Sequence, residues 1–277
     1  MDSQLLKKLD TLRDLIRKEG KAVVALSGGT DSSLLCFMVH KILGGKSHAV
    51  TACSEFLIHD ERRIVGKIVK RYGIPHTFLS FSLLGNDDVR KNPPDRCYHC
   101  KKAIFNQLRR YAGEHGFTVV FDGTNTDDRE EERPGILALR ELNIRSPFVE
   151  AGLGKAEIIE IALSEGLEEL IRPSNSCLAT RISVHTPITE GVLRMVEKAE
   201  EYIRGMGFPV VRVRYHNPNT ARIELPRSEI PKLFSLDLSS CISRVLKEIG
   251  FKRISVDIDG YLAGCESILL QRDFNSS

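Results

Sequence analysis

Hydrophobic positions in the first two thirds of the chain follow two alternating patterns. Short runs of apolar, often β-branched residues, typical of buried parallel strands, occupy residues 22–26, 49–53, 78–81, 119–122 and 146–150. Between these runs, apolar residues recur every three or four positions, as in amphipathic helices, over residues 3–18, 34–43, 64–69, 104–111 and 155–163. Strands alternating with helices predict an α/β fold: a parallel, Rossmann-like sheet whose ligands bind at the carboxyl ends of the strands.

The pattern changes after about residue 172. Residues 174–181 show no period and predict a loop, and residues 188–206 predict a helix with its apolar stripe on one face. Residues 210–215 and 221–225 alternate with period two around Asn217-Pro218-Asn219, which predicts a hairpin with Arg212, Arg214 and Glu224 on its polar face. A helix near 242–249 and a strand at 254–258 complete a smaller α+β domain. We therefore predict domains at 1–178 and 179–277.

The composition narrows the class of protein. The chain has 277 residues, a net charge of +3 and seven cysteines. No apolar run reaches the length of a membrane span, and the small charge excess makes nucleic acid an unexpected partner. An odd number of cysteines without a secretory apolar region favours a reducing cytoplasm and metal or catalytic use of thiols over disulfides.

The first predicted strand leads into Ser-Gly-Gly-Thr-Asp-Ser-Ser, residues 27–33, which we call the phosphate loop. Glycines let backbone amides approach an anion, serine hydroxyls add donors, and the following helix presents its positive N-terminus. No Gly-Lys-Ser/Thr follows, so the loop is not of the Walker type, and an ordinary strand–turn–helix is the alternative. The loop resembles that of the PP-loop ATP pyrophosphatases, which cleave ATP between its α- and β-phosphates. The predicted nucleotide-binding residues are Ser27, Gly28, Gly29, Asp31, Ser32 and Ser33, with Asp31 orienting Mg²⁺ as a catalytic residue.

Polar residues follow the fourth predicted strand at Gly123-Thr124-Asn125. Because carboxyl ends of parallel strands share one edge of the sheet, we expect Gly123 and Asn125 to face the same crevice as the phosphate loop.

Three cysteines form a candidate metal site. Cys97 and Cys100 open a predicted helix, where thiol pKa values are lowered, and two ligands are too few for a closed zinc site. Cys177 lies in the loop that leaves the α/β domain, so the three thiolates are expected to converge on a 4Fe–4S cluster with one open iron. The alternatives are a metal-free catalytic Cys177, zinc completed by His99, or buried thiols. The remaining cysteines are predicted to be core residues: Cys36, Cys53, Cys241 and Cys265. The two histidines of the candidate segments, His99 and His216, are predicted to be solvated.

Several segments together resemble the LarE family. They are residues 27–33 (SGGTDSS), 92–101 (NPPDRCYHCK), 122–125 (DGTN), 133–135 (RPG), 177–181 (CLATR), 212–216 (RVRYH) and 221–226 (ARIELP). The resemblance implies an ATP-dependent sulfurtransferase of nickel-pincer nucleotide biosynthesis, the cofactor of lactate racemase. Such enzymes adenylate a carboxylate of pyridinium-3,5-biscarboxylic acid mononucleotide and convert it to a thiocarboxylate. The resemblance also implies a homo-oligomer, in one form a hexamer.

The family has two variants. One sacrifices the sulfur of the cysteine that matches Cys177, and the other adds a Cys-x-x-Cys and carries sulfide on a 4Fe–4S cluster. With Cys97 and Cys100, this sequence resembles the second variant, which takes sulfide or another sulfur donor. It departs from the family pattern at Thr30, where Val is common, and in an acidic insertion at residues 130–132.

The resemblance also assigns residues of the C-terminal domain. Arg212 and Arg214 match positions that grip the substrate phosphate, and alternate arginines on a strand suit a bidentate anion clamp. Glu200 matches an acidic residue of the same pocket and is placed on the helix face opposite the apolar stripe. For all three, a merely solvated position is the alternative.

Other functions compete with this interpretation. tRNA thiolation uses the same loop. The sequence has no second Cys-x-x-Cys and only a small excess of positive charge, and both observations count against this function. Amide synthesis of the NAD- or GMP-synthetase kind leaves the cysteines without a task. A nucleotide- or cluster-binding regulator without turnover is the non-enzymatic alternative.

Overall fold

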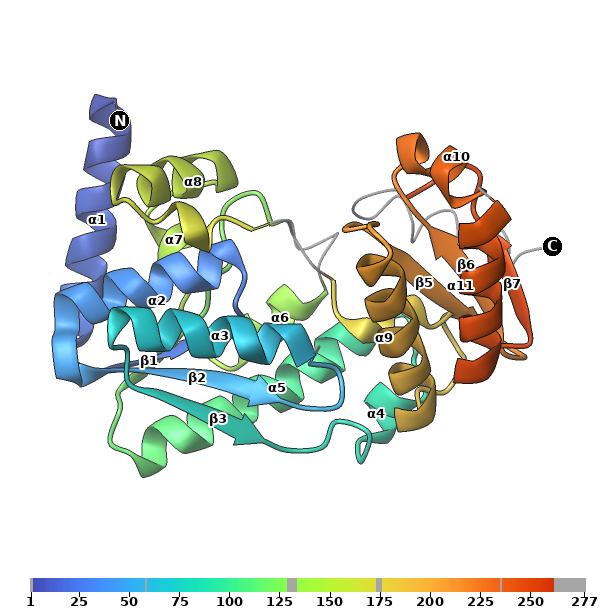
Figure 1. Ribbon diagram of the computed structural model, residues 1–277. Helices are drawn as coiled ribbons and strands as arrows, with labels where there is room; N and C mark the ends of the chain where they lie inside the picture. Colours follow the sequence, from blue (N-terminus) through green and yellow to red (C-terminus); the bar gives the residue numbers. More distant parts are fainter. Residues whose placement is uncertain (1, 58, 129–133, 173–175, 235, 262–277) are drawn as a thin grey trace. The chain divides into compact units, whose positions relative to one another are not determined.

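The computed structural model describes residues 2–57, 59–128, 134–172, 176–234 and 236–261 (Figure 1). The chain divides into two compact units. The first unit comprises Met1–Leu83 and Asp95–Ser176, and the second comprises Leu84–Pro94 and Cys177–Ser277. No helix in the described ranges is long and apolar enough to cross a membrane.

A parallel four-stranded sheet forms the centre of the first unit. Its strands are β1 (Ala22–Ala25), β2 (Ser47–Cys53), β3 (His76–Ser80) and β4 (Val119–Phe121), in the order β3-β2-β1-β4. The chain moves from β1 to β2 on one side, whereas β4 pairs with β1 on the other. The strand order therefore reverses between β1 and β4, and this switch point is where open α/β sheets bind ligands.

Helices cover both faces of this sheet because its strands bury alternate side chains on opposite sides. Val24 and Ala49 contribute to a core with α1 (Ser3–Glu19), α2 (Thr30–Leu43), α3 (His59–Tyr72), α7 (Pro147–Glu150) and α8 (Lys155–Ser164). Val23 and Val50 contribute to a second core with α5 (Arg96–Glu114) and α6 (Gly135–Glu141). Short 3-10 turns lie at η1 (Gly44–Lys46) and η2 (Glu168–Leu170). The predicted α/β fold with a parallel sheet is confirmed.

The strand predicted at residues 146–150 is wrong. Pro147 lies at the start of helix α7, with Ser146 as its N-cap. Proline fixes φ near the helical value and needs no hydrogen-bond acceptor in the first turn, which outweighs the β preference of Phe148 and Val149. Among the described residues, an isolated parallel bridge between Phe121 and Arg145 lies at this edge of the sheet.

The second unit contains a three-stranded sheet of order β5-β6-β7. The hairpin of β5 (Arg212–His216) and β6 (Thr220–Glu224) is antiparallel, and β7 (Arg253–Val256) pairs with β6 in parallel. Helix α9 (Glu190–Gly205) packs on β5, and α11 (Leu236–Ile249) packs on α9 and β7. The shorter elements are α4 (Asp87–Arg90), η3 (Leu178–Arg181), η4 (Arg227–Glu229) and α10 (Ile230–Leu233).

Residues 84–94 belong to the second unit although they precede the helix of Cys97. The Asn92 side chain is fully buried, and its Nδ2 donates to the carbonyls of Ile182 (3.2 Å) and Ser183 (2.8 Å). The Asn92 carbonyl accepts from the His185 N–H at 2.9 Å. The chain therefore enters the second unit once before residue 177, which a single boundary at 178/179 leaves out.

Cysteines outside the candidate metal site differ in burial. Cys36 is buried, and burial raises its thiol pKa to about 12, as expected of an inert core thiol. Cys53 and Cys241 are only half-buried, and Cys265 lies outside the described residues.

Candidate functional site

The phosphate loop is closed by its own hydroxyl groups. Ser27 Oγ lies 2.9 Å from Ser32 Oγ, and Ser32 Oγ also accepts from the Ser27 N–H at 3.2 Å. Ser32 Oγ donates in turn to the Gly29 carbonyl at 3.2 Å. Because Gly29 is the N-cap of α2 and has no side-chain capping bond, the first turn of that helix leaves backbone N–H groups for an anion.

Two glycines are required by the packing around this loop. Gly28 has φ +85°, and a Cβ there would lie 3.2 Å from Val65 Cγ2 of α3. A Cβ on Gly123 would lie 2.8 Å from the Ser32 backbone nitrogen. The end of β4 therefore lies directly against the first turn of α2, and it is this packing that requires Gly123.

Asp31 connects the phosphate loop to the end of β4 and to helix α8. Its Oδ2 accepts from Asn125 Nδ2 at 3.2 Å, and its Oδ1 lies 2.5 Å from Lys155 Nζ. Asn125 is held in turn, because its Oδ1 accepts from the Asp127 N–H at 2.9 Å. The structure therefore brings Asp31 and Asn125 together as expected and adds Lys155, which sequence reasoning missed.

Two hydroxyl residues of the phosphate loop itself, Ser33 and Thr30, do not point to an open anion site. Ser33 is fully buried, and among the described residues its hydroxyl finds no hydrogen-bond partner. Thr30 Oγ1 donates to the Arg172 carbonyl at 3.2 Å and accepts from the Arg172 N–H at 3.0 Å. The Thr30 hydroxyl thus joins the start of α2 to the backbone of Arg172.

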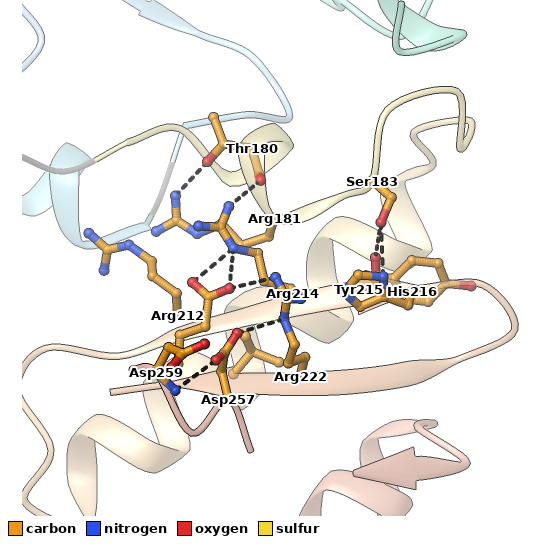
Figure 2. Close-up of polar contacts among 12 residues, drawn as sticks. Thr180, Arg181, Ser183, Arg212, Arg214, Tyr215, His216, Arg222, Asp257 and Asp259 are labelled. Carbon is orange, nitrogen blue, oxygen red and sulfur yellow. Dashed lines mark hydrogen bonds and ion pairs between the residues drawn. The ribbon is translucent and has the colours of Figure 1, made fainter. Parts of the chain in front are cut away.

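Arginine–glutamate ion pairs link several elements of the second unit. Figure 2 shows the side chains of Arg181, Arg214 and Arg222 among their polar neighbours. Arg181 Nε donates to Glu200 Oε1 at 2.9 Å, with both side chains 0% exposed. Arg214 Nε donates to Glu224 Oε1 and Oε2 at 2.9 and 3.0 Å, and Arg222 approaches the same Oε1 at 2.9 Å. We refer to these five residues as the arginine–glutamate network.

The network holds the segment that begins with Cys177. The Cys177 carbonyl accepts from Arg181 Nη1 at 2.9 Å and from Thr180 Oγ1 at 2.7 Å, while Arg214 Nη1 donates to the Thr180 carbonyl at 2.7 Å. Cys177 itself is exposed as the N-cap of η3. The backbone at the exposed Cys177 is therefore held by the Arg181 guanidinium group, and the end of the same turn, at Thr180, is held by Arg214.

Arg212 differs from the other arginines of the hairpin. Its side chain is 7% exposed, yet no ion pair among the described residues includes it, and its Nε is buried without a hydrogen-bond partner. Its Nη1 donates to the Val211 carbonyl at 2.9 Å, and its guanidinium lies 5.1 Å from the centre of the Tyr261 ring. Burial, followed by the charge of Arg181, lowers the pKa of Arg212 from its ordinary value. The charge of Glu200 and the side chain of Tyr261 act in the opposite direction and partly compensate the buried charge of Arg212.

Two expectations about the second unit are corrected. Glu200 does not lie opposite the apolar stripe: it follows Val196 by four positions on the buried face of α9. Its charge is accommodated because Arg181 and the Val213 N–H, at 3.1 Å, donate to it. The solvated alternative for the hairpin residues is also wrong, since Arg212, Arg214 and Glu224 are 7%, 6% and 4% exposed.

Comparison with known proteins identifies the family. The asparagine synthase family matches residues 9–128. An uncharacterized protein of Synechocystis is 34% identical over 258 residues, 93% of this chain and 96% of that protein. Pyridinium-3,5-bisthiocarboxylic acid mononucleotide synthase of Lactiplantibacillus plantarum is 31% identical over 261 residues, 94% of each chain. The chain belongs to the LarE family.

A more distant relative bears on the competing function. The tRNA-specific 2-thiouridylase of Amoebophilus asiaticus is 25% identical over 234 residues, 69% of this chain and 61% of that protein. The relationship to the synthase covers a larger share of both proteins, 94% of each chain.

None of the three cysteines of the predicted cluster forms a disulfide. Cys97 and Cys100 lie one turn apart at the start of α5, exposed and half-buried respectively, whereas Cys177 opens the main segment of the second unit. Within the described ranges, no three or more Cys, His, Asp or Glu residues form a group that holds a metal ion. The convergence of the cysteines stays a prediction.

The two candidate histidines are not fully solvated. His99 is half-buried, with Nε2 3.1 Å from Asp95 Oδ2. His216 is also half-buried, its Nδ1 lies 3.1 Å from Ser183 Oγ, and burial lowers its pKa.

Some functional candidates escaped sequence reasoning. The roles of Arg181 and Lys155 depend on partners 19 and 124 residues away along the chain. Glu224 was predicted on the polar face of the hairpin, but its pairing with Arg214 was not. The available signal was weak: an arginine ending the CLATR segment, and a lysine beginning a helix after Gly154.

Proposed function

We propose that the protein is an ATP-dependent sulfurtransferase that adenylates a carboxylate of pyridinium-3,5-biscarboxylic acid mononucleotide and replaces the adenylate with sulfur. The observation that carries the proposal is the relationship to the Lactiplantibacillus plantarum synthase, which covers 94% of each chain. It therefore includes the second unit, whereas the asparagine synthase match ends at residue 128 and concerns the nucleotide part alone.

The first unit supplies the adenylation chemistry in this proposal. Backbone N–H groups of the phosphate loop and the start of α2 bind the β- and γ-phosphates. Asp31, with the phosphates themselves, fits the one or two carboxylates that Mg²⁺ usually takes from a protein. A substrate carboxylate oxygen attacks the α-phosphorus, and the bond to the bridging oxygen breaks with release of pyrophosphate. A sulfur nucleophile then attacks the acyl carbon, and AMP leaves with the bonding electrons.

The second unit supplies the substrate phosphate site. Arg212 is the best candidate for the phosphate, because its charge is buried and, among the described residues, its side chain forms no direct ion pair. Arg214 is already bonded to Glu224 and the Thr180 carbonyl, so we assign it, with Glu200, to positioning the segment of Cys177. The expected clamp of two equivalent arginines thus becomes one anion-binding arginine and one positioning arginine.

The sulfur source divides the proposal into two forms. Three cysteines outside any disulfide, two of them one turn apart on α5, suit iron as a donor set, and Cys97, Cys100 and Cys177 would hold a 4Fe–4S cluster. Such a cluster supplies an iron with an open position for a sulfur donor. In the alternative form Cys177 gives up its own sulfur, and Cys97 and Cys100 have no task.

Anaerobic reconstitution separates these forms. The cluster form predicts iron and acid-labile sulfide in the protein, their loss in both Cys97→Ala and Cys177→Ala, and their retention in the matched control Cys241→Ala. It also predicts multiple turnovers with sulfide and an unchanged intact mass. A single turnover with loss of about 34 Da at position 177, together with an active Cys97→Ala variant, would establish the sacrificial form instead.

The substrate class is tested by competition. With Mg·ATP, we expect pyrophosphate and AMP to form with the pyridinium mononucleotide and not with unmodified tRNA. Formation of thiolated tRNA would favour the relationship to the thiouridylase, and formation of ADP would exclude both adenylation reactions. Full-length protein is used, and its oligomeric state, which we expect to be a homo-oligomer and in one form a hexamer, is measured in the same preparation. A reducing cytoplasm stays the expected location.

A further inference from the structure

Arg212 and Arg214 lie two positions apart on β5, yet their guanidinium groups are stabilised in different ways. Arg214 donates from Nε to both carboxylate oxygens of Glu224 and from Nη1 to the Thr180 carbonyl. The guanidinium of Arg212 lies instead over the ring of Tyr261, with Cζ 5.1 Å from the ring centre. This distance is within the range of a cation–π interaction. Tyr261 therefore stabilises the charge of Arg212 where a carboxylate stabilises that of Arg214.

This difference decides which donors remain for a ligand. A carboxylate partner takes up guanidinium N–H groups one by one, whereas the face of an aromatic ring attracts the charge as a whole. Nη1 of Arg212 donates to the Val211 carbonyl at 2.9 Å, and its buried Nε has no hydrogen-bond partner among the described residues. The ring of Tyr261 thus stabilises a largely buried cation and leaves N–H groups to bind an anion.

The turn that follows β7 brings Tyr261 to this position. We call residues 257–261 the closing turn. The Asp257 N–H donates to the Ile223 carbonyl of β6 at 2.9 Å, and the Tyr261 N–H donates to the Leu225 carbonyl, directly after β6, at 2.7 Å. Both ends of the closing turn are therefore fixed to β6 or to the residue that follows it.

The closing turn is tight enough to require a glycine. Gly260 has φ +83°, and a Cβ there would lie 2.8 Å from the Leu225 carbonyl oxygen. Within the same turn, Asp257 Oδ1 accepts from the Asp259 N–H at 3.1 Å (Figure 2). The half-buried Tyr261 side chain is therefore carried on a backbone that is held at several points.

We propose that Tyr261 is a positioning residue of the substrate phosphate site. Its ring stabilises the charge of Arg212, limits the motion of the guanidinium and keeps N–H donors available to the phosphate of the mononucleotide. A guanidinium held in this way loses less side-chain entropy when it binds an anion. The inference rests on the proposed function, because it concerns the phosphate site that is assigned there to Arg212.

Removing the ring is expected to weaken phosphate binding. In Tyr261→Leu the Arg212 side chain gains freedom and water reaches its guanidinium. Binding of ribose 5-phosphate, measured by calorimetry with the full-length protein, should therefore weaken about 3- to 30-fold. Tyr261→Phe keeps the ring and should bind within about 2-fold of the wild-type protein. In turnover, Tyr261→Leu should raise the KM for the pyridinium mononucleotide by a similar factor and leave the KM for ATP unchanged.

A double-mutant cycle shows whether Tyr261 acts through Arg212. Arg212→Ala should weaken ribose 5-phosphate binding about 10- to 100-fold, and adding Tyr261→Leu should weaken it no further. A tyrosine with a purely structural role would add its own loss in both backgrounds. The matched control is Tyr202→Leu, which removes another half-buried ring of the second unit, on α9, and should leave binding and KM unchanged.

Four results would overturn the proposal. They are binding in Tyr261→Leu equal to that in Tyr202→Leu, a loss in Tyr261→Phe as large as in Tyr261→Leu, additive losses in the double variant, and binding that Arg212→Ala leaves unchanged. Because ribose 5-phosphate binding does not use the sulfur-transfer reaction, failure of the proposed function is recognised separately, by absence of the thiocarboxylate.

Discussion

The Lys155–Asp31 pair of the first unit has side chains 39% and 23% exposed, whereas Arg181 and Glu200 of the second unit are both 0% exposed. The first pair lies beside a loop of hydroxyl and amide groups and, being partly exposed, contributes little to stability. The second anchors the backbone of an exposed cysteine, and separating it leaves a charge buried. The charged groups of the first pair are therefore accessible to ligands, whereas those of the second pair hold a fixed geometry.

The largest expected effect is a loss of stability when the buried Arg181–Glu200 pair is broken. Arg181→Met leaves Glu200 buried with only the 3.5 Å contact of Arg204 as an ion pair among the described residues, and should lower the free energy of unfolding by about 3–5 kcal/mol. Urea unfolding of the full chain measures it. The control Arg204→Met, at a 25% exposed side chain, should cost less than about 1 kcal/mol.

A double variant distinguishes charge from packing. Arg181→Met combined with Glu200→Leu removes both charges and should recover most of the lost stability. If Arg181→Met costs no more than Arg204→Met, the network does not hold the second unit as described.

The partly exposed Lys155–Asp31 pair is tested by changing Asp31. Asp31→Asn removes the anionic oxygen offered to Mg²⁺ and should reduce pyrophosphate formation about 100- to 1,000-fold. Its effect on stability should stay below about 1 kcal/mol, because the pair with Lys155 is partly exposed. A large loss of stability with intact Mg²⁺ dependence would contradict the assignment.

The two regions also differ in how much of their structure could be predicted from the sequence. The strands, the phosphate loop and the hairpin follow from patterns within a few residues, and the structure contains them. Pro147 and Glu200 misled the predictions, because a helix start replaced a strand and a distant arginine allowed a glutamate to be buried. Lys155 and residues 84–94 were missed because their roles depend on contacts between distant segments, which no local period records.

A smaller effect separates the two arginines on β5. Arg212→Ala should weaken binding of the pyridinium mononucleotide by about 1.5–3 kcal/mol while leaving ATP binding unchanged, because Arg212 has no ion-pair partner among the described residues. Arg214→Ala also removes a bond to Glu224 and should lower stability as well. Isothermal calorimetry with each ligand measures the split. Equal losses for ATP and substrate in Arg212→Ala would exclude a separate phosphate site.

The smallest effect concerns acid stability of the first unit. Burial, and then His48, lowers the pKa of His76 to about 4, and its Nε2 lies 2.9 Å from Thr51 Oγ1. Between pH 6.5 and 4 the unfolded chain binds a proton that the folded chain does not, so stability falls as pH falls. From pH 7 to 5 the loss should be about 1–2 kcal/mol after allowance for solvent screening.

Urea unfolding at the two pH values checks this. His76→Gln should reduce the pH dependence, whereas His185→Asn, at an exposed position, should not. An unchanged pH dependence in His76→Gln would contradict the assignment of the acid sensitivity to His76.

Mass spectrometry of one anaerobic reaction tests the central claim most directly. Full-length protein, Mg·ATP, sulfide and pyridinium-3,5-biscarboxylic acid mononucleotide are combined, and the pyridinium product and the nucleotides are identified together. We expect a product with carboxylate oxygen replaced by sulfur, with one AMP formed for each sulfur introduced. Consumption of ATP to ADP, or AMP formation without a sulfur-containing pyridinium product, would contradict the account.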